Sequence, residues 1–399
     1  MPFMKPDFPP EAFPPHALAA PSHPSPYPWY AALVAGPPLV FDTPRGLWLA
    51  SSARAVQEVL DNPACRVRPL AEPVPPALAG SAAGEVFGQL VRMNEGVRHD
   101  APKLALQRFL AAADLGLVRA RTGALARQRA GGAPLRGPAL SGWVMDVPVM
   151  AVADMLGFAD AELPQVAHWM ADFVACFSPL STPARLAAAS DAAAALLARL
   201  AELVRTAAAR PESAVARLQQ EAARAGWHDA GALLANLVGL LSQTHEATAG
   251  LVGNSIVALA TQLGLLPAVR REPERLLAMV HEVSRYDPSI HNTRRFVAEA
   301  TCVAGTWLRP GDVVLLVLAA AGRDPLCNPR PDEFILERTD RNVPGFGRGA
   351  HQCPGRALAC TIAASALQVL LSGPSLLPDL PAHWHYREST NARMPVFTA

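Results

Sequence analysis

Apolar residues recur at helical spacing through most of the chain. Residues 84–209 are rich in Ala, Leu and Arg with this spacing, and the same texture continues from Glu212 through Arg285. The alanine-rich tract 187–198 is also predicted to be helix, because leucines fall at helical intervals along it. The pattern indicates several packed helices, with breaks expected at Gly131–Gly132, Pro134, Pro164 and the loop from Cys176 to Pro183.

Short strands are predicted at three places. Residues 39–50 are typical of two strands around a turn, and a short helix is expected to follow from Ala53 to Asn62. Residues 301–318 carry β-branched and apolar side chains on both sides of Pro310–Gly311, which favours a hairpin with its turn there. The tail from His383 again has the pattern of a strand. The predicted fold class is mainly α with small β-sheets.

The first forty residues are dense in proline, which argues against regular helix and favours an extended segment. Aromatic residues such as Phe3, Phe13 and Trp29 have no reason to occur in a solvated linker, so we expect this segment to lie over the surface of a larger body. We predict one fold over residues 1–399, with a small-sheet region at about 1–65 and a helix-rich body at about 66–399.

One stretch is long enough, and apolar enough, to raise the question of a membrane span. Between Ala230 and Val269 the only formally charged side chain is Glu246, and residues 247–269 carry no charge. The stretch also holds polar residues such as Asn254, and a lipid-facing charge at its middle would cost about 2.5 kcal/mol or more. A buried core helix from roughly Ala230 to Leu266 is therefore the preferred interpretation. The proline-broken start lacks the apolar run of a signal peptide, and we expect a cytoplasmic protein without a membrane span.

Overall charge and cysteine usage exclude several classes of protein. Lys and Arg number 35 and Asp and Glu 34, so the formal net charge is +1, whereas a nucleic-acid partner calls for a basic excess. The six cysteines form no C-x-x-C pair, which argues against a disulfide scaffold or a zinc finger and favours a reducing compartment.

The most informative segment is Pro344 to Ala359. Its glycines at 345, 347 and 349 allow the backbone to fold tightly, and Cys353 then presents a sulfur just before a position where Pro354 could begin a helix. The positive end of a helix dipole stabilises a thiolate, which is the form that ligates a metal. A lone cysteine is more commonly a small buried hydrophobe, and Cys360 is assigned to that class.

The sequence from Phe346 to Gly355 resembles the proximal haem loop of the cytochrome P450 superfamily. Glu282 and Arg285 resemble the family's buried Glu-x-x-Arg pair, and 323–325 and 331–334 resemble the stretch that precedes the haem loop. The resemblance implies the cytochrome P450 fold, as a single haem domain of the soluble bacterial type, with a long distal helix over the haem.

The resemblance implies a haem b cofactor ligated by the Cys353 thiolate, with Phe346 and Gly355 in the loop around it. Thiolate ligation favours cleavage of the dioxygen bond. Buried propionates need donors. The candidates by resemblance are His99, Lys103, Arg295 and His351, each of which could instead be a solvated surface charge. Lys103 stands where many relatives have arginine, so a point-charge contact replaces a bidentate one.

The distal helix departs from the family pattern. Where the family has Ala-Gly-x-Asp/Glu-Thr-Thr, this chain has Gln243-Thr244-His245-Glu246-Ala247-Thr248. The acid is kept as Glu246, but Ala247 replaces the alcohol. The resemblance therefore makes Glu246, Thr244 and Thr248 the candidate catalytic residues. Helical spacing puts Gln243 and Thr244 on the face of Ala247. The alternative is that Thr244 bonds its own i−4 carbonyl and merely bends the helix.

Substrate and partners follow from the resemblance more weakly. Gln243, Ala247, His291 and Asn292 are placed in the substrate pocket, although the polar three could equally face backbone. A small, mainly apolar substrate and O2 are expected, and electrons would come from a separate ferredoxin-type donor. The protein is expected to be a monomer. The docking face for the donor could be formed by Arg348, Arg356, Lys103 and Arg108.

Three classes of function remain open. The first is a monooxygenase that inserts one oxygen atom from O2 into a C–H bond. The second, which the altered distal motif keeps open, is a haem-thiolate oxidase of atypical proton relay that performs oxidative coupling, desaturation or peroxide-driven chemistry. The third is a non-catalytic haem or ligand-binding protein. Zinc bound by His351 and Cys353 is disfavoured, because no second ligand pair has zinc spacing.

Overall fold

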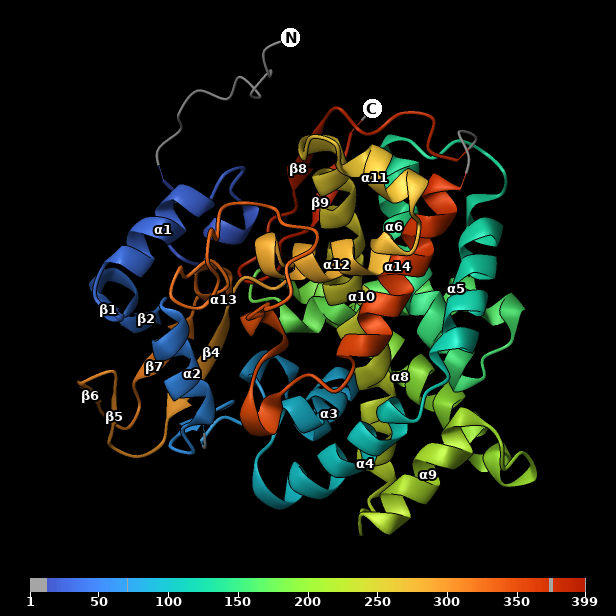
Figure 1. Ribbon diagram of the computed structural model, residues 1–399. Helices are drawn as coiled ribbons and strands as arrows, with labels where there is room; N and C mark the ends of the chain where they lie inside the picture. Colours follow the sequence, from blue (N-terminus) through green and yellow to red (C-terminus); the bar gives the residue numbers. More distant parts are fainter. Residues whose placement is uncertain (1–12, 70, 373–375, 399) are drawn as a thin grey trace.

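The computed structural model describes residues 13–69, 71–372 and 376–398. It is mainly helical, with a small sheet region at one side (Figure 1). The helices are α1 (Tyr27–Ala35), α2 (Ala53–Asp61), α3 (Ala82–Gln89), α4 (Asp100–Ala111), α5 (Leu115–Ala130), α6 (Gly137–Leu156), α7 (Leu163–Phe173), α8 (Pro183–Thr206), α9 (Ala214–Arg224), α10 (Ala230–Thr261), α11 (Leu265–Arg271), α12 (Arg275–Tyr286), α13 (Leu318–Ala321) and α14 (Arg356–Leu371).

Strands from two distant segments, residues 39–66 and 293–316, form one five-stranded sheet in the order β1-β2-β7-β4-β3. Strand β2 pairs antiparallel with β1 and parallel with β7. The sheet region is therefore not confined to the first 65 residues, as Figure 1 shows where blue and orange strands meet. The strands are β1 (Leu39–Asp42), β2 (Leu47–Ala50), β3 (Cys65–Arg66), β4 (Thr293–Val297), β5 (Thr301–Val303), β6 (Thr306–Leu308), β7 (Val313–Leu316), β8 (Trp384–Tyr386) and β9 (Pro395–Phe397).

The hairpin after residue 300 turns earlier than the sequence suggested. Strands β5 and β6 pair with each other across Ala304–Gly305, and both turn residues have positive φ, 48° and 81°. Such a turn matches the twist of a two-stranded hairpin. Pro310–Gly311 instead leads from β6 to β7, which pairs with β2 and β4. A turn does lie at Pro310–Gly311, but the hairpin expected around it was wrong, whereas the strand expected in the tail is present as β8 and β9.

The proline-dense N-terminal segment contains a helix that the sequence analysis excluded. Helix α1 begins at Tyr27, and Pro28 lies in its first turn, where a missing N–H removes no helical hydrogen bond. Tyr30, a residue of this helix, is buried. Ser22 donates to the carbonyl of Arg387, so this segment does lie against the body of the protein. Phe3 and the other residues of 1–12 lie outside the described residues.

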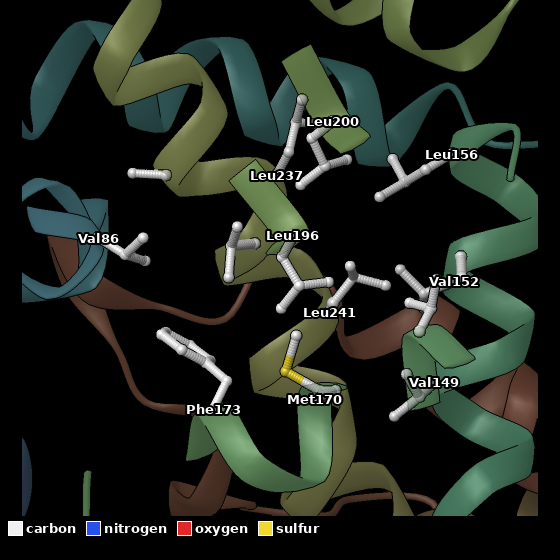
Figure 2. Close-up of a cluster of buried hydrophobic side chains, with 14 of the residues drawn as sticks. Val86, Val149, Val152, Leu156, Met170, Phe173, Leu196, Leu200, Leu237 and Leu241 are labelled. Atoms are coloured by element: carbon white, nitrogen blue, oxygen red, sulfur yellow. The ribbon is translucent and has the colours of Figure 1, made fainter. Parts of the chain in front are cut away.

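The long helix α10 runs through the core and packs against α6, α14, α3 and α12. Side chains from α3, α6, α7, α8 and α10 meet in the apolar cluster of Figure 2. Helix α10 ends at Thr261, and Gly264, with φ of 76°, separates it from α11. The expected buried core helix is confirmed, but it ends before Leu266.

Packing in the core also explains why other long helices of the protein are apolar. Within the described residues, Gly137–Leu156 and Gly349–Leu371 are long and apolar enough to cross a membrane, and α10 with α11 would make a third, bent span. The apolar windows of the first two are 61% and 56% buried inside the fold. Helix α6 packs on α10 and α14 packs on α5, so their apolar faces serve the core.

Candidate active site

The loop before α14 is folded tightly around its cysteine. The N–H of Cys353 donates to the carbonyl of Phe346 over 2.7 Å, which closes the loop. Gly347 has φ of 67°, and a Cβ at this position would lie 3.2 Å from the carbonyl oxygen of His351. Helix α14 begins at Arg356 rather than at Pro354. Cys353 therefore lies just before the N-terminus of a 16-residue helix, as the sequence predicted.

The two cysteines of this region differ in their surroundings. Cys353 is exposed, whereas Cys360 inside α14 is completely buried and burial raises the pKa of its thiol to about 12. Nearby protein also raises the pKa of Cys353, but the Gly355 N–H, Lys103 and Arg356 act in the opposite direction. Cys353 thus combines access with groups that stabilise an anionic sulfur.

Basic side chains gather beside this loop. The rings of His99 and His351 are 4.3 Å apart, and His351 Nε2 lies 3.0 Å from Glu95 Oε2. Arg295 on β4 is buried, and burial lowers the pKa of its guanidinium while Glu95 raises it. Lys103 donates to the carbonyl of Gln352 over 2.5 Å and so contacts the cysteine loop itself. The structure brings all four expected donors to the same side of the fold as Cys353.

These residues fit a haem. His99 Nε2 is buried without a hydrogen-bond partner among the described residues, and such a group calls for an acceptor such as a propionate. The Arg295 guanidinium is buried, and within residues 13–69, 71–372 and 376–398 it donates only to the neighbouring carbonyl of Arg294. An accessible thiol beside these donors matches the chemistry of an iron porphyrin with two carboxylates. Cys353 would hold the iron, and His99, Arg295, His351 and Lys103 would hold the propionates.

On α10 the polar side chains mostly bond their own helix. Thr244 Oγ1 donates to the carbonyl of Leu240 over 2.8 Å, and Gln243 Nε2 donates to that of Gly239 over 3.0 Å. This is the i−4 alternative considered above for Thr244. Its oxygen can still accept a hydrogen bond. Thr248 is buried, one position beyond Ala247.

Glu246 is paired with a residue that sequence analysis missed. Its carboxylate accepts from Arg387, which follows β8 in the C-terminal region. Both side chains are partly exposed. The sequence holds no local signal for this pair, because the partners are 141 positions apart.

His291 and Asn292 are both committed to other partners. His291 is completely buried, its Nδ1 is 2.8 Å from Tyr30 Oη, and burial lowers its pKa to about 4. Asn292 Nδ2 donates to the carbonyl of Thr390 over 2.8 Å. The structure therefore groups His291 with the N-terminal helix α1 and ties Asn292 to backbone, the alternative stated for it.

Glu282 and Arg285 form the centre of a buried network. Arg285 Nη2 is 2.6 Å from Glu282 Oε1, and neither side chain is exposed. Arg338 and Arg341 also bind Glu282, at 3.2 and 3.0 Å, which the sequence analysis did not foresee. Burial raises the pKa of Glu282, but the arginines and the Ile335 N–H outweigh it and hold the pKa below its usual value. Arg285 also donates to the carbonyl of Pro331, so the pair fastens α12 to the segment before the cysteine loop.

The arrangement of these elements defines a class of protein. The solved structure titled CalO2 superposes with a TM-score of 0.80 at 23% identity, covering 94% of this chain and 96% of its own. The P450 heme domain of Tepidiphilus thermophilus gives a TM-score of 0.82 at 16% identity, covering 94% of each chain. The fold is that of the cytochromes P450.

Sequence comparison leads to the same group. The family model described as Cytochrome P450 matches residues 274–376, which include the Glu282 network and the cysteine loop. Cytochrome P450 144 of Mycobacterium tuberculosis is 33% identical over 232 residues, covering 58% of this chain and 54% of that protein. The match spans about half the length of this curated relative. Residues 274–376 therefore match the cytochrome P450 family in sequence, within a chain that has the fold of these proteins.

Proposed function

We propose that the protein is a haem-thiolate monooxygenase that inserts one oxygen atom from O2 into a C–H bond of a small, mainly apolar molecule. The observation that carries this proposal is the accessible Cys353 thiol beside the unpartnered Nε2 of His99 and the buried guanidinium of Arg295. A bound haem ligated by a cysteine thiolate would supply oxygen activation, because such ligation favours cleavage of the dioxygen bond.

The chain's own residues have separable tasks. The Gly355 N–H and the N-terminus of α14 stabilise the Cys353 thiolate. The carbonyl of Phe346 accepts a hydrogen bond from the Cys353 N–H, which fixes the conformation of the loop. Glu282 and Arg285 hold α12 against the chain that leads into this loop.

Glu246 and Thr244 are proposed to manage protons on the distal side. The Thr244 hydroxyl donates a hydrogen bond to the carbonyl of Leu240. Its oxygen is therefore free to accept a hydrogen bond from a water and to orient that water. Glu246 is the proton source, and its pairing with Arg387 holds the carboxylate in place. Thr248 and the substrate itself are the alternative positions for this relay, because Ala247 carries no hydroxyl.

The electron donor is proposed to be a separate ferredoxin-type protein that docks beside the cysteine loop. Arg356, the first residue of α14, lies 5.0 Å from the centroid of the Phe346 ring, and Arg108 lies in the last turn of α4. Arg348 is already paired with Asp61 at 2.6 Å, which weakens its share of this face. We propose a monomeric cytoplasmic protein without a membrane span.

A second candidate is a haem-thiolate oxidase with an atypical proton relay. Two observations favour it: Ala247 replaces the alcohol, and the Thr244 hydroxyl is committed to its own helix. Such an enzyme would perform oxidative coupling, desaturation or peroxide-driven chemistry.

The test is spectroscopy followed by turnover under labelled oxygen. The reduced protein with carbon monoxide should show the band of a thiolate-ligated haem, and its absence would contradict both candidates. Turnover of apolar compounds under 18O2 with a ferredoxin donor should then place one labelled atom in the product. Product formation without label would favour the oxidase, and the complete absence of product with every compound would favour a ligand-binding role.

A further inference from the structure

Arg92 lies beside helix α10, in a segment that is hydrogen-bonded to Asn236 of this helix. It lies in the short turn Val91–Met93 between α3 and α4. The N–H of Val91 donates to Asn236 Oδ1 on α10 over 2.8 Å, and Asn236 Nδ2 donates to the carbonyl of Gln89 over 2.9 Å. The backbone that leads into this turn is thereby fastened to α10, the helix that carries Glu246.

The guanidinium of Arg92 points from this anchor toward the segment after α7. Its central carbon lies 4.5 Å from the centroid of the Phe177 ring. Phe177 packs edge-on against Phe173, the α7 residue that closes the apolar cluster in Figure 2, with centroids 5.5 Å apart. Glu246 and Cys176 both act on the charge of Arg92 from nearby. Arg92 therefore lies between α10 and Phe177, among apolar side chains.

Arg92 has no protein partner for its charge among the described residues. Its Nε is buried without a hydrogen bond, and no carboxylate lies within ion-pair distance of its guanidinium in the described part of the chain. Glu246 is already committed to Arg387. Burial lowers the pKa of Arg92, but an arginine stays protonated in a protein, so the charge remains.

Two deeply buried arginines of this chain, Arg285 and Arg393, are fully engaged, whereas Arg295 is assigned above to a haem propionate. Arg285 binds Glu282 and three carbonyls, and Arg393 binds Asp287 and three carbonyls. Arg92 is partly buried with an unsatisfied Nε among apolar side chains, and charges held in such surroundings are ordinarily paired in proteins. The contrast indicates that the partner of Arg92 comes from outside the chain.

We propose that the substrate of this enzyme carries a carboxylate, which Arg92 binds through its guanidinium fork while the apolar part of the substrate extends along α10. This deepens the proposed function and rests on it. A carboxylate matches the planar, bidentate geometry of one guanidinium. A phosphate monoester would bring up to two charges to a site in which one guanidinium faces phenyl rings.

Imidazole-tethered probes test this with the haem-loaded protein. Alkanoic acids that carry an imidazole at the far end of the chain bind haem iron through the imidazole, so every probe reports by a shift of the Soret band. Each acid is compared with the alcohol and the phosphonate of the same chain length, over a series of lengths. At the best length the acid should bind at least about tenfold more tightly than the alcohol, as expected for hydrogen bonds to a charged group.

Variants then assign the preference to a residue. Arg92→Gln should reduce the acid-to-alcohol preference to about one while the affinity for the alcohol changes little, and Arg92→Lys should retain part of it. Arg68 is the matched control, because its guanidinium also lies over a ring, that of Phe87 at 5.3 Å, but donates to the carbonyl of Glu72. Arg68→Gln should leave the preference within about twofold of the wild-type value.

Several outcomes would overturn the assignment. Equal affinity for acid and alcohol at every length, a preference that survives Arg92→Gln, or loss of the preference in Arg68→Gln alone would each do so, and tighter binding of the phosphonate would reject the carboxylate. Calorimetric titration repeats the comparison without the optical signal. A missing carbon monoxide band would instead reject the proposed function, so the two failures are distinguishable.

Discussion

Cys353 and Cys360 belong to one loop and helix but have opposite environments. We predict that Cys353→Ala abolishes the thiolate band of the reduced carbon monoxide complex, because the exposed sulfur beside the Gly355 N–H is lost. Cys360→Ala should leave the band unchanged and cost about 1 kcal/mol of unfolding free energy, as for a small deletion in a packed core. An unaltered band in the Cys353 variant would contradict the ligand assignment.

Thr244 is the residue on which the proton relay depends in our proposal. Thr244→Ala and the nearly isosteric Thr244→Val should both uncouple the reaction, with product per electron pair falling by up to about tenfold and peroxide rising, because one hydrogen bond to an oriented water is lost. Ala247→Thr in either background should restore part of the coupling.

Two measurements decide this point. Product and peroxide are quantified against the reductant consumed, with Thr248→Val as the control on the same helix. Coupling that is unchanged in both Thr244 variants, but collapses when a hydroxyl of the substrate is methylated, would show a substrate-assisted relay instead.

At the residue scale, sequence reasoning predicted local geometry where the signal is local. The glycines and the cysteine of 345–353 lie in one short segment, so the tight loop and its place before a helix could be predicted without a fold. The pairing of Glu246 with Arg387 could not, because the partners meet only through the packing of the C-terminal region on α10. Helical spacing placed Gln243 and Thr244 on one face, but it could not say that both side chains bond their own helix.

At the scale of elements, α12 depends on the charges gathered around Glu282. Glu282→Ala should lower the free energy of unfolding by about 3 to 5 kcal/mol and give little haem-loaded protein, because three arginines lose their common partner in the interior. Arg341→Ala removes a single contact with Glu282 that is more exposed than the others, and it should lower the free energy of unfolding by clearly less. Urea denaturation and the haem content of purified protein measure both, and a stable, haem-loaded Glu282→Ala protein with only slower turnover would contradict the structural role.

The same carboxylate gives a pH dependence of stability. The pKa of Glu282 is lower in the folded protein than its ordinary value of 4.5. Its contribution to stability is therefore present above about 4.5 and is lost as pH falls through the folded pKa. The urea midpoint of the wild type should decrease as the pH is lowered below 4.5. In Glu282→Gln the midpoint should depend less steeply on pH. Equal slopes in the two proteins would count against this assignment.

The ends of elements were harder to predict than their existence. Helix α10 was expected to reach Leu266, but it ends at Thr261, and Gly264 in the left-handed conformation precedes a separate helix, α11. The proline density before residue 40 concealed α1, since a proline in the first turn of a helix is harmless while one in its interior is not. In both cases the residue types alone did not locate the end of the helix. The structure places the end of α10 at Thr261 and the start of α1 at Tyr27.

At the scale of the whole molecule, the pairing of distant segments lies beyond periodicity. The parallel pairing of β2 with β7 brings residues 48–50 beside 314–316, and no local pattern specifies that partner. The mainly helical class with small sheets was nevertheless correct, because it depends only on the summed local signals.

Arg393 joins the two ends of the chain, and the last prediction concerns it. It binds Asp287 at 2.8 Å and donates to the carbonyls of Pro21, His23 and Pro24, while its guanidinium stacks 3.3 Å over the Tyr386 ring. Burial raises the pKa of Asp287, but Arg393 and neighbouring donors outweigh this and lower it strongly. Removing the guanidinium would leave a buried carboxylate with fewer partners and release three carbonyls of the N-terminal segment.

Arg393→Met should therefore lower the free energy of unfolding by about 3 to 5 kcal/mol and expose the segment before α1 to protease. Arg387→Met is the matched control, because this side chain is partly exposed, and it should cost about 1 kcal/mol or less. Urea denaturation gives the energies, and mass spectrometry of brief proteolysis locates the first cut. If the first cut in Arg393→Met falls elsewhere while stability drops, Arg393 supports Asp287 alone and does not fasten the N-terminal segment.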